Sequence, residues 1–221
     1  MPPLRVFYHV AGLGNWRKVV SAQLSVLDSS GLREAAEMYV TLTGEACGIQ
    51  VGAVAGVREE VDVGRFEFPT LAWAQAMALA RSEESYVLYL HTRGASRPDS
   101  VPVWDHGRMM DYFLIERWRD VLPRLDEGYE CAGCDPGYFP DLPGRPFHFS
   151  GNCWWARSSF LRRLPKVRSL DWRNRFAAEA WIGMGGQPNA FTLHASHVNH
   201  YDEPYPRERY ALGATGQVPG H

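Results

Sequence analysis

Two kinds of hydrophobic pattern alternate along the first 128 residues of the chain. Continuous apolar runs, typical of buried strands, are separated by segments in which apolar residues recur at helical spacing. The apolar runs predict strands at 4–10, 37–44 and 86–92, with shorter extended pieces at 49–56 and 61–68. The helical spacing predicts helices at 15–28, 69–83 and 103–125. This alternation favours an α/β fold, a three-layer α/β/α sandwich around a mainly parallel central sheet.

The second half of the chain is more irregular and is rich in aromatic residues. Strands are predicted at 129–135 and 191–201, and a loop with many prolines and glycines lies at 136–146. An aromatic strand and turn at 147–156 and two short helices, at 158–164 and 173–186, complete the pattern. From Pro204 onward the sequence predicts a loose extension. The chain is therefore interpreted as one domain over 1–203 with a C-terminal tail at 204–221.

Composition narrows the possible functions. The chain has 221 residues and a formal net charge of −2, so no basic surface field indicates nucleic acid as a partner. It contains no apolar run long enough to span a membrane, and the amino-terminal sequence lacks the apolar stretch of a signal peptide. With four cysteines, a cytoplasmic protein whose thiols are reduced is the simplest interpretation.

The stretch "YVLYLHTRGAS" (86–96) places polar residues directly after an apolar strand. In open α/β sheets, ligands bind at the carboxyl ends of the strands. Arg93 there could form two parallel hydrogen bonds to a phosphate, and Gly94 would allow close backbone approach. The alternative is a strand end with solvated polar side chains.

The stretch "GLGNWR" (12–17) follows the first predicted strand and opens a helix. It is a truncated dinucleotide-binding fingerprint, because Arg17 stands where the third glycine would be. A glycine turn at a helix amino terminus can bind an anion, and Asn15 can cap that helix. A plain turn between strand and helix remains the alternative.

Two later stretches contain candidate pocket residues. Trp154 and Trp155 are adjacent on a predicted strand and so point to opposite faces, which allows one to line a pocket while the other is core. Asn152 offers a donor and an acceptor, which suits sugar hydroxyls. Glu179 lies in an apolar helical stretch, where burial would raise its pKa toward that of a general base. In the alternative, both tryptophans are core and Glu179 is on the surface.

Histidines and cysteines give weaker signals. His194, His197 and His200 are spaced by three, but on a strand His197 would oppose the other two, so joint ligation of one metal is not expected. Cys131 and Cys134 have the spacing of a zinc pair, yet on a strand they too face opposite ways, which favours core cysteines over a zinc site. The sequence contains no Gly-x-Ser-x-Gly elbow and no P-loop, which disfavours serine hydrolases and P-loop kinases.

In their order along the chain, several motifs carry a resemblance to a known family: "YVLYLHTRGAS", "WDHGRMMDYFL", "HFSGNCWWAR", "AEAWIG" and "HVNHY". The chain resembles a group of glycosyltransferase-like proteins that have a strand ending in His-Thr-Lys-Gly and a later Gly-Asn-Phe-Trp-Trp. The resemblance covers roughly residues 4–201. It implies a GT-A-type, Rossmann-like fold that binds a nucleotide-sugar donor, with a UDP-sugar favoured, and a glycan or small-molecule acceptor.

The resemblance also implies roles for individual residues. Glu179 corresponds to the general base that deprotonates the acceptor. The residues that correspond to the nucleotide and diphosphate site are His9, Asn15, Glu67, Thr70, His91, Thr92 and Arg93. Those that correspond to the sugar or acceptor pocket are Trp104, Gly151, Asn152, Trp154 and Trp155.

One departure from the family pattern affects metal binding. No Asp-x-Asp stands at 91–93, although its carboxylates normally hold Mg²⁺ or Mn²⁺ against the diphosphate. Arg93 would supply positive charge in its place, or the ion would be held by Asp135 with His197 or His200. No cofactor is firmly predicted, and Mn²⁺ or Mg²⁺ remain candidates. The alternatives to a transferase are a non-catalytic nucleotide- or glycan-binding domain and, less favoured, a Cys/His zinc hydrolase.

Overall fold

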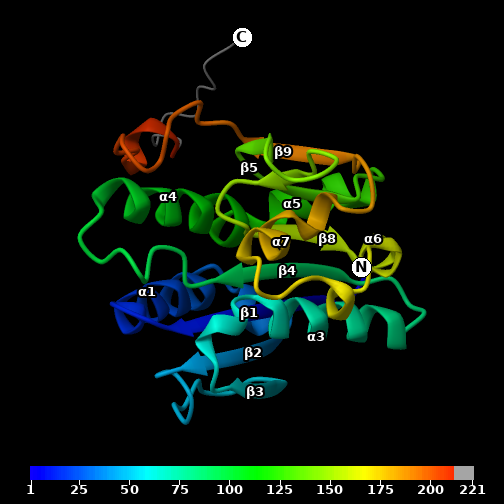
Figure 1. The fold of residues 1–221 in the computed structure, drawn as a ribbon, viewed down its shortest axis with the longest axis horizontal. Coiled ribbons are helices and arrows are strands. Elements are labelled where there is room, and N and C mark those ends of the chain that lie inside the picture. The colour runs from blue at the N-terminus through cyan, green and yellow to red at the C-terminus, as the bar shows by residue number, and fades with distance from the viewer. Residues whose placement is uncertain (212–221) are drawn as a thin grey trace.

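Seven strands form one central sheet in the order β3-β2-β1-β4-β8-β5-β9 in the computed structural model, which describes residues 1–211 (Figure 1). The sheet strands are β1 (Leu4–Gly12), β2 (Ala36–Gly44), β3 (Gly56–Glu60), β4 (Tyr86–His91), β5 (Cys131–Cys134), β8 (Trp154–Arg157) and β9 (Ala190–His194). Strand β8 runs antiparallel to its neighbours β4 and β5, and the other pairs in the sheet are parallel. The predicted α/β class with a mainly parallel sheet is confirmed.

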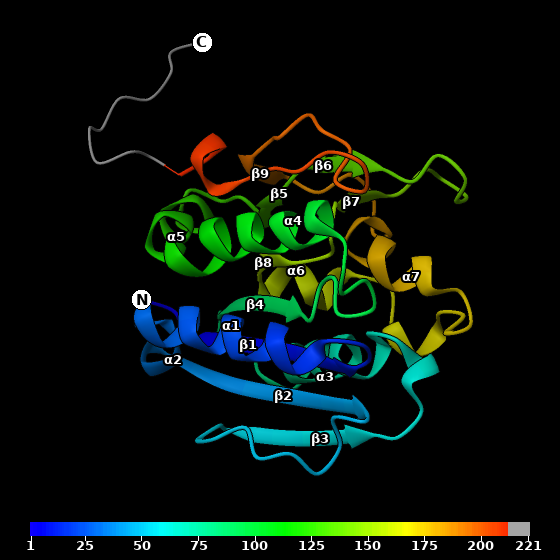
Figure 2. The same ribbon diagram turned by 90° about the vertical axis from the view of Figure 1, so that its left-hand side faces the viewer.

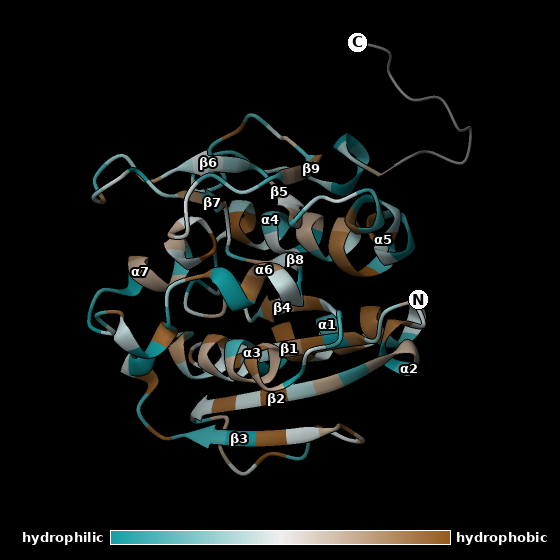
Figure 3. Ribbon diagram, turned by 90° about the vertical axis from the view of Figure 1, so that its right-hand side faces the viewer, coloured by the Kyte–Doolittle hydropathy of each residue, from teal (hydrophilic) through white to brown (hydrophobic). Residues whose placement is uncertain are grey.

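Helices cover both faces of this sheet. One face packs against α1 (Trp16–Ser29), α2 (Leu32–Ala35), α4 (Val101–Asp111) and α5 (Trp118–Asp126). The other face packs against α3 (Phe68–Ala80), α6 (Ser158–Arg163) and α7 (Arg175–Ala180). Figure 2 shows α1, α4 and α5 in front of the sheet, and Figure 3 shows α3 and α6 on the opposite side. Each face therefore has its own hydrophobic core, as three layers require.

The central strands are apolar because both of their faces are covered. Strand β4 has five buried residues followed by the half-buried His91, and nearly all of β1 is buried. Parallel strands between two helical layers typically read as such continuous apolar runs. The edge strand β3 instead ends in charged residues, visible as its hydrophilic colour in Figure 3, which discourages pairing with another chain.

The direction in which the chain crosses the sheet reverses beside β1. From β1 the chain moves to β2 and β3 on one side, then returns to place β4 on the other side. Strands β1 and β4 are in register, so that His9 and His91 are partners at their carboxyl ends. In open α/β sheets, the crevice outside such a reversal is where ligands bind.

Several sequence predictions about elements are wrong. The strand β3 lies between the extended pieces predicted at 49–56 and 61–68, and the strand predicted at 191–201 ends at His194. The segment 61–68 is not extended: Val63–Arg65 forms a 3₁₀ turn, where the Asp62 carboxylate accepts a hydrogen bond from the Gly64 backbone N–H. The predicted helix at 103–125 is divided by a π-helical turn at Tyr112–Glu116. At this turn the Leu114 carbonyl accepts a hydrogen bond from the indole N–H of Trp155, which competes with the regular helical bond.

The remaining elements are small. Strands β6 (Pro136–Tyr138) and β7 (Phe147–Phe149) form a separate hairpin, in which β6 lies in the predicted loop and β7 opens the predicted aromatic strand. Short 3₁₀ turns lie at Val167–Ser169, Trp181–Gly183 and Arg207–Arg209.

The start of the predicted loose tail is packed instead. Tyr205 and Tyr210 are buried in the core beside α4 and the π-helical turn, because their rings have apolar surface to cover. Arg207 pairs with Glu116 through two short contacts. Residues 212–221, the rest of the predicted tail, lie outside the described part. Among the described residues, no helix has the length and apolar character needed to cross a membrane.

Candidate functional site

A cleft opens at the carboxyl ends of β1 and β4, where the chain direction reverses. It holds about 750 Å³ of empty space, counted to its open mouth. Its walls come from the ends of both strands, the turn before α3, and α7. Six of the residues predicted for the site line it: His9, Glu67, His91, Thr92, Arg93 and Glu179. The fold therefore gathers most of the predicted diphosphate residues and the predicted base around one cavity.

Two carboxylates face this cleft, Glu67 at the start of α3 and Glu179 on α7. Burial raises the pKa of Glu67 above its ordinary value. Burial, and then the negative charge of Glu67, raises the pKa of Glu179. A carboxylate with a raised pKa holds a proton more strongly than an ordinary glutamate, which is the property that a general base needs.

Two arginines supply the positive charge of the cleft. Arg175, one helical turn before Glu179, places Nη2 3.6 Å from the Glu179 carboxylate. Arg93 donates from Nη2 to the Tyr201 hydroxyl at 3.3 Å and lies over the Tyr201 ring, while its buried Nε has no hydrogen-bond partner within residues 1–211. The Arg93 side chain is therefore held at the cleft with donor capacity to spare.

Both ring nitrogens of His91 face other groups of the protein, but only one of them makes a hydrogen bond. Burial lowers the pKa of His91 to about 4, so the ring is neutral at pH 7. Its Nε2 lies 2.7 Å from the Gly151 carbonyl, which can only accept, so Nε2 carries the proton. Nδ1 lies 3.5 Å from a Glu67 carboxylate oxygen. The single N–H of the neutral ring is therefore bound to Gly151, and His91 has no free N–H for a ligand.

Three further predicted residues contribute mainly to packing around the cleft. His9 contacts the Thr70 hydroxyl at 2.9 Å, and burial lowers the pKa of His9 to about 3. The Thr92 hydroxyl accepts a hydrogen bond from the Ala11 backbone N–H and so joins the ends of β4 and β1. Thr70 lies behind His9 rather than on the cleft wall.

The predicted sugar pocket is not formed by the tryptophans. Trp154 and Trp155 do lie on opposite faces of the sheet, but both are fully buried, one in each core. Asn152 is also buried, and its amide oxygen accepts from the Trp154 indole N–H. A four-residue strand between two helical layers exposes neither face, which is why both indoles are core.

Two other predicted residues do not line the cleft. Trp104 on α4 packs under the ammonium group of Lys18 on a different surface. Asn15 precedes α1, where its side chain makes no capping hydrogen bond and its backbone N–H donates to the Ala95 carbonyl.

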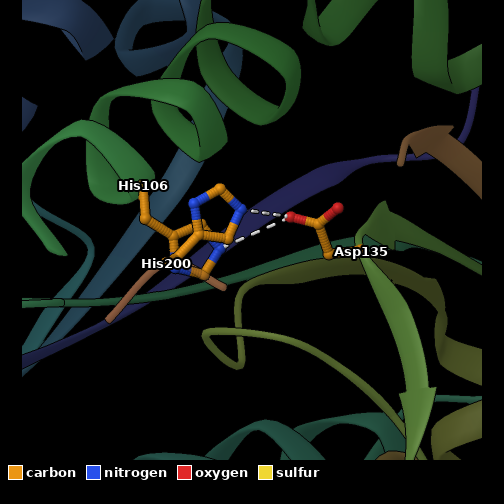
Figure 4. Close-up of side chains that lie close together, drawn as sticks. All are labelled: His106, Asp135 and His200. Carbon is orange, nitrogen blue, oxygen red and sulfur yellow. Dashed lines mark hydrogen bonds and ion pairs between the residues drawn. The ribbon is translucent and has the colours of Figure 1, made fainter. Parts of the chain in front are cut away.

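A second polar cluster combines His106 of α4, Asp135 after β5 and His200 of the C-terminal segment (Figure 4). The Asp135 carboxylate lies 2.9 Å from His200 Nε2 and 3.8 Å from His106 Nε2. Burial, and then the charge of Arg93, lowers the pKa of His106 well below its ordinary value. Burial alone would raise the pKa of Asp135, but hydrogen bonds from His200 and Ser196 lower it. His197, also predicted here, is exposed and is not part of this cluster.

The cysteines do not form a joint ligand set. Cys131 is buried in one core and Cys134 in the other, on opposite faces of the sheet, as the strand pattern predicts. Burial raises the pKa of both thiols. The structure therefore gives no support to zinc bound by this pair.

Two site residues were missed by the sequence interpretation, although each left a signal. Arg175 stands four residues before Glu179, the spacing that brings two side chains to the same helix face. His106 stands three residues after Val103 and four before Met110, on the buried face of its helix. A histidine at such a position was a candidate for a buried polar cluster.

In comparisons with known proteins, the chain matches no protein-family model and none of the curated proteins.

Proposed function

We propose that the protein is a glycosyltransferase of GT-A type, which transfers a sugar from a nucleotide-sugar donor to an acceptor hydroxyl. The observation that carries the proposal is the composition of the cleft between β1 and β4. There, two carboxylates with raised pKa, Glu67 and Glu179, lie with two arginines, Arg93 and Arg175. The resemblance of the sequence motifs adds support.

The proposed reaction uses these charges in distinct ways. The Glu179 carboxylate takes the proton of the acceptor hydroxyl as that oxygen bonds to the anomeric carbon of the sugar. The bond from that carbon to the diphosphate breaks, and the nucleoside diphosphate leaves. Arg93 stabilises the negative charge that develops on the diphosphate. His91, whose single N–H is bound to the Gly151 carbonyl, lies beside Glu67 and has no N–H to offer the donor.

Binding of the donor is tested by thermal unfolding in the presence of UDP-, GDP-, CMP- and TDP-sugars, each with and without Mn²⁺. A donor present at about 100 times its Kd stabilises the folded protein by about 2.7 kcal/mol. For a domain of this size, we expect Tm to rise by about 5 to 10 °C. One nucleotide class should produce this shift, with a UDP-sugar favoured.

Arg93→Ala should abolish the shift, because the diphosphate loses its cationic partner. Arg97→Ala is the matched control, since Arg97 packs over the same Tyr201 ring but does not line the cleft. An unchanged shift in Arg93→Ala would refute the placement of the diphosphate. A shift without any turnover of the donor would instead favour a non-catalytic nucleotide-binding domain.

A further inference from the structure

We propose that His106, Asp135 and His200 form a binding site for one divalent first-row transition-metal ion. The three residues come from distant parts of the chain, and their candidate ligand atoms all lie within 4.8 Å of one another. Figure 4 shows the two imidazole rings beside the Asp135 carboxylate. This inference does not rest on the proposed transfer reaction, because metal binding is measured directly.

The distances between the ligand atoms suit a shared ion. A tetrahedral ion with bonds of about 2.0 to 2.1 Å holds neighbouring ligand atoms about 3.4 Å apart. The two distances from Asp135 Oδ2, 2.9 Å to His200 Nε2 and 3.8 Å to His106 Nε2, lie on either side of that value. The rings are stacked with centroids 3.9 Å apart and planes within 4°. Because a bound ion lies in the plane of each imidazole, ligation requires the two rings to tilt out of this stack.

His106 has polar atoms that nothing in the described protein satisfies. Its side chain is 0% exposed, and neither ring nitrogen has a hydrogen-bond partner within residues 1–211. Buried polar atoms are nearly always paired, and leaving one unpaired is costly. A bond from Nε2 to a metal ion would satisfy the nitrogen that faces Asp135.

The backbone and its hydrogen bonds aim Asp135 at the two histidines. A register irregularity in β5 at Gly133 and Cys134 precedes Asp135, whose φ of 47° is left-handed. Bulges at strand ends commonly redirect a side chain in this way. The Ser196 backbone N–H donates to Oδ1 and leaves Oδ2 directed at the rings. Such support of a ligand by an outer hydrogen bond is typical of metal sites.

The site can exchange ions and small ligands with solvent. A cavity that holds about 700 Å³ of empty space, counted to its open mouth, is lined by residues that include Asp135, His200 and Tyr201. Three protein ligands leave a coordination position for water or for an oxygen of a bound ligand, as in catalytic zinc sites. Two imidazoles and one carboxylate favour ions such as Zn²⁺, Co²⁺ or Fe²⁺ over Mg²⁺ and Ca²⁺, which prefer oxygen ligands.

The test is a titration of untagged, chelator-treated protein with Co²⁺, followed by its visible absorption and by calorimetry. We expect one Co²⁺ per chain and displacement by Zn²⁺, with no displacement by excess Mg²⁺. His106→Gln and Asp135→Asn should each weaken binding by about 100-fold or more. His197→Gln is the matched control, because His197 lines the same cavity but is exposed and does not belong to the three-residue cluster, so its loss should leave binding unchanged.

X-ray absorption of the wild-type Zn²⁺ complex gives a second readout that needs no variant. We expect two imidazole ligands and no sulfur. The proposal is overturned if the wild-type protein binds neither Co²⁺ nor Zn²⁺ at micromolar concentration, or if sulfur ligation is found. It is equally overturned if His197→Gln weakens binding as much as His106→Gln does, since the ion would then be at the surface.

Discussion

Glu67 illustrates at the scale of one residue how the cleft is tuned. Its carboxylate lies at the start of α3 next to the neutral ring of His91, and burial raises its pKa. Its charge in turn raises the pKa of Glu179. In its ionised form, Glu67 therefore makes the neighbouring carboxylate more basic, and burial makes that ionised form unfavourable in the folded protein.

The pH dependence of folding should reveal the cost of that charge. Because the folded-state pKa of Glu67 is raised, its stabilising contribution is complete below the unfolded pKa and is lost as pH rises through the folded pKa. Glu67→Gln stays neutral at every pH, and its amide N–H can donate to the lone pair of His91 Nδ1. We expect the variant to gain Tm over wild type at pH 8, and to gain less at pH 5.

Thermal unfolding across this pH range measures the effect. The control is Glu45→Gln, at an exposed position outside the cleft, which measures the effect of the same substitution on the protein surface. If Glu67→Gln lost stability relative to wild type as pH rises, the fold would stabilise the Glu67 anion, and its pKa would be lowered instead of raised.

At the scale of elements, the turn between β7 and β8 connects the cleft to the second cluster. Gly151 in this turn has a φ of 84° and gives its carbonyl to His91. A Cβ at Gly151 would lie 2.7 Å from Met110 Sδ and 3.0 Å from His106 Cε1. The turn therefore packs directly on α4 and needs a residue without a side chain.

Gly151→Ala should be destabilised by two effects, the left-handed backbone and the overlap with α4. Gly48→Ala is the matched control, because Gly48 has a φ of 82° and nothing within 4 Å of its added Cβ. We expect the control to lose about 1 kcal/mol. Gly151→Ala should lose about 1 to 3 kcal/mol more. Equal losses in urea unfolding would show that the turn does not pack on α4 as described.

The helices and strands were predicted well from the sequence where a single local rule determines the structure. The apolar runs of β1 and β4 follow from burial on both faces, and Pro69 marks the first turn of α3. The prediction from sequence failed where a contact with a residue distant in the chain decides the local structure. The π-helical turn at Tyr112–Glu116 coincides with a hydrogen bond from Trp155, forty-one residues from its acceptor, which no local pattern reveals.

The candidate site was predictable only where local patterns place its residues, as they do for the elements. His91, Arg93 and Glu179 follow from strand ends and from an acid in an apolar helix, and they do share the cleft. The tryptophan pair looked like pocket residues because a strand has two faces, but tertiary packing covers both. His106 joins Asp135 and His200 only through the fold, because these residues are far apart in sequence.

At the scale of the whole molecule, the C-terminal segment closes the core over α4. Tyr205 is buried, its hydroxyl lies 2.9 Å from His194 Nε2, and its backbone N–H donates to the Asp105 carboxylate. The segment 204–211 thus belongs to the same folding unit as the sheet, which predicts a single cooperative unfolding transition.

Tyr205→Ala should lower the free energy of unfolding by about 3 to 5 kcal/mol, because a buried ring is removed. Tyr205→Phe keeps the ring and loses one hydrogen bond, so it should cost about 1 kcal/mol. Urea denaturation of both variants measures these losses. A near-neutral Tyr205→Ala would mean that the segment is not anchored in the core.

The proposed function is tested most directly by the turnover of Glu179→Gln with the donor that stabilises the protein. Nucleoside diphosphate release in the presence of acceptor and the Kd of the donor are measured on the same preparation. Glu→Gln keeps the shape of the side chain and removes the base, so kcat should fall by about 10² to 10⁴ while the donor Kd stays within about twofold. A variant that turns over donor at the wild-type rate would contradict the assignment of Glu179 as the base and the mechanism built on this cleft.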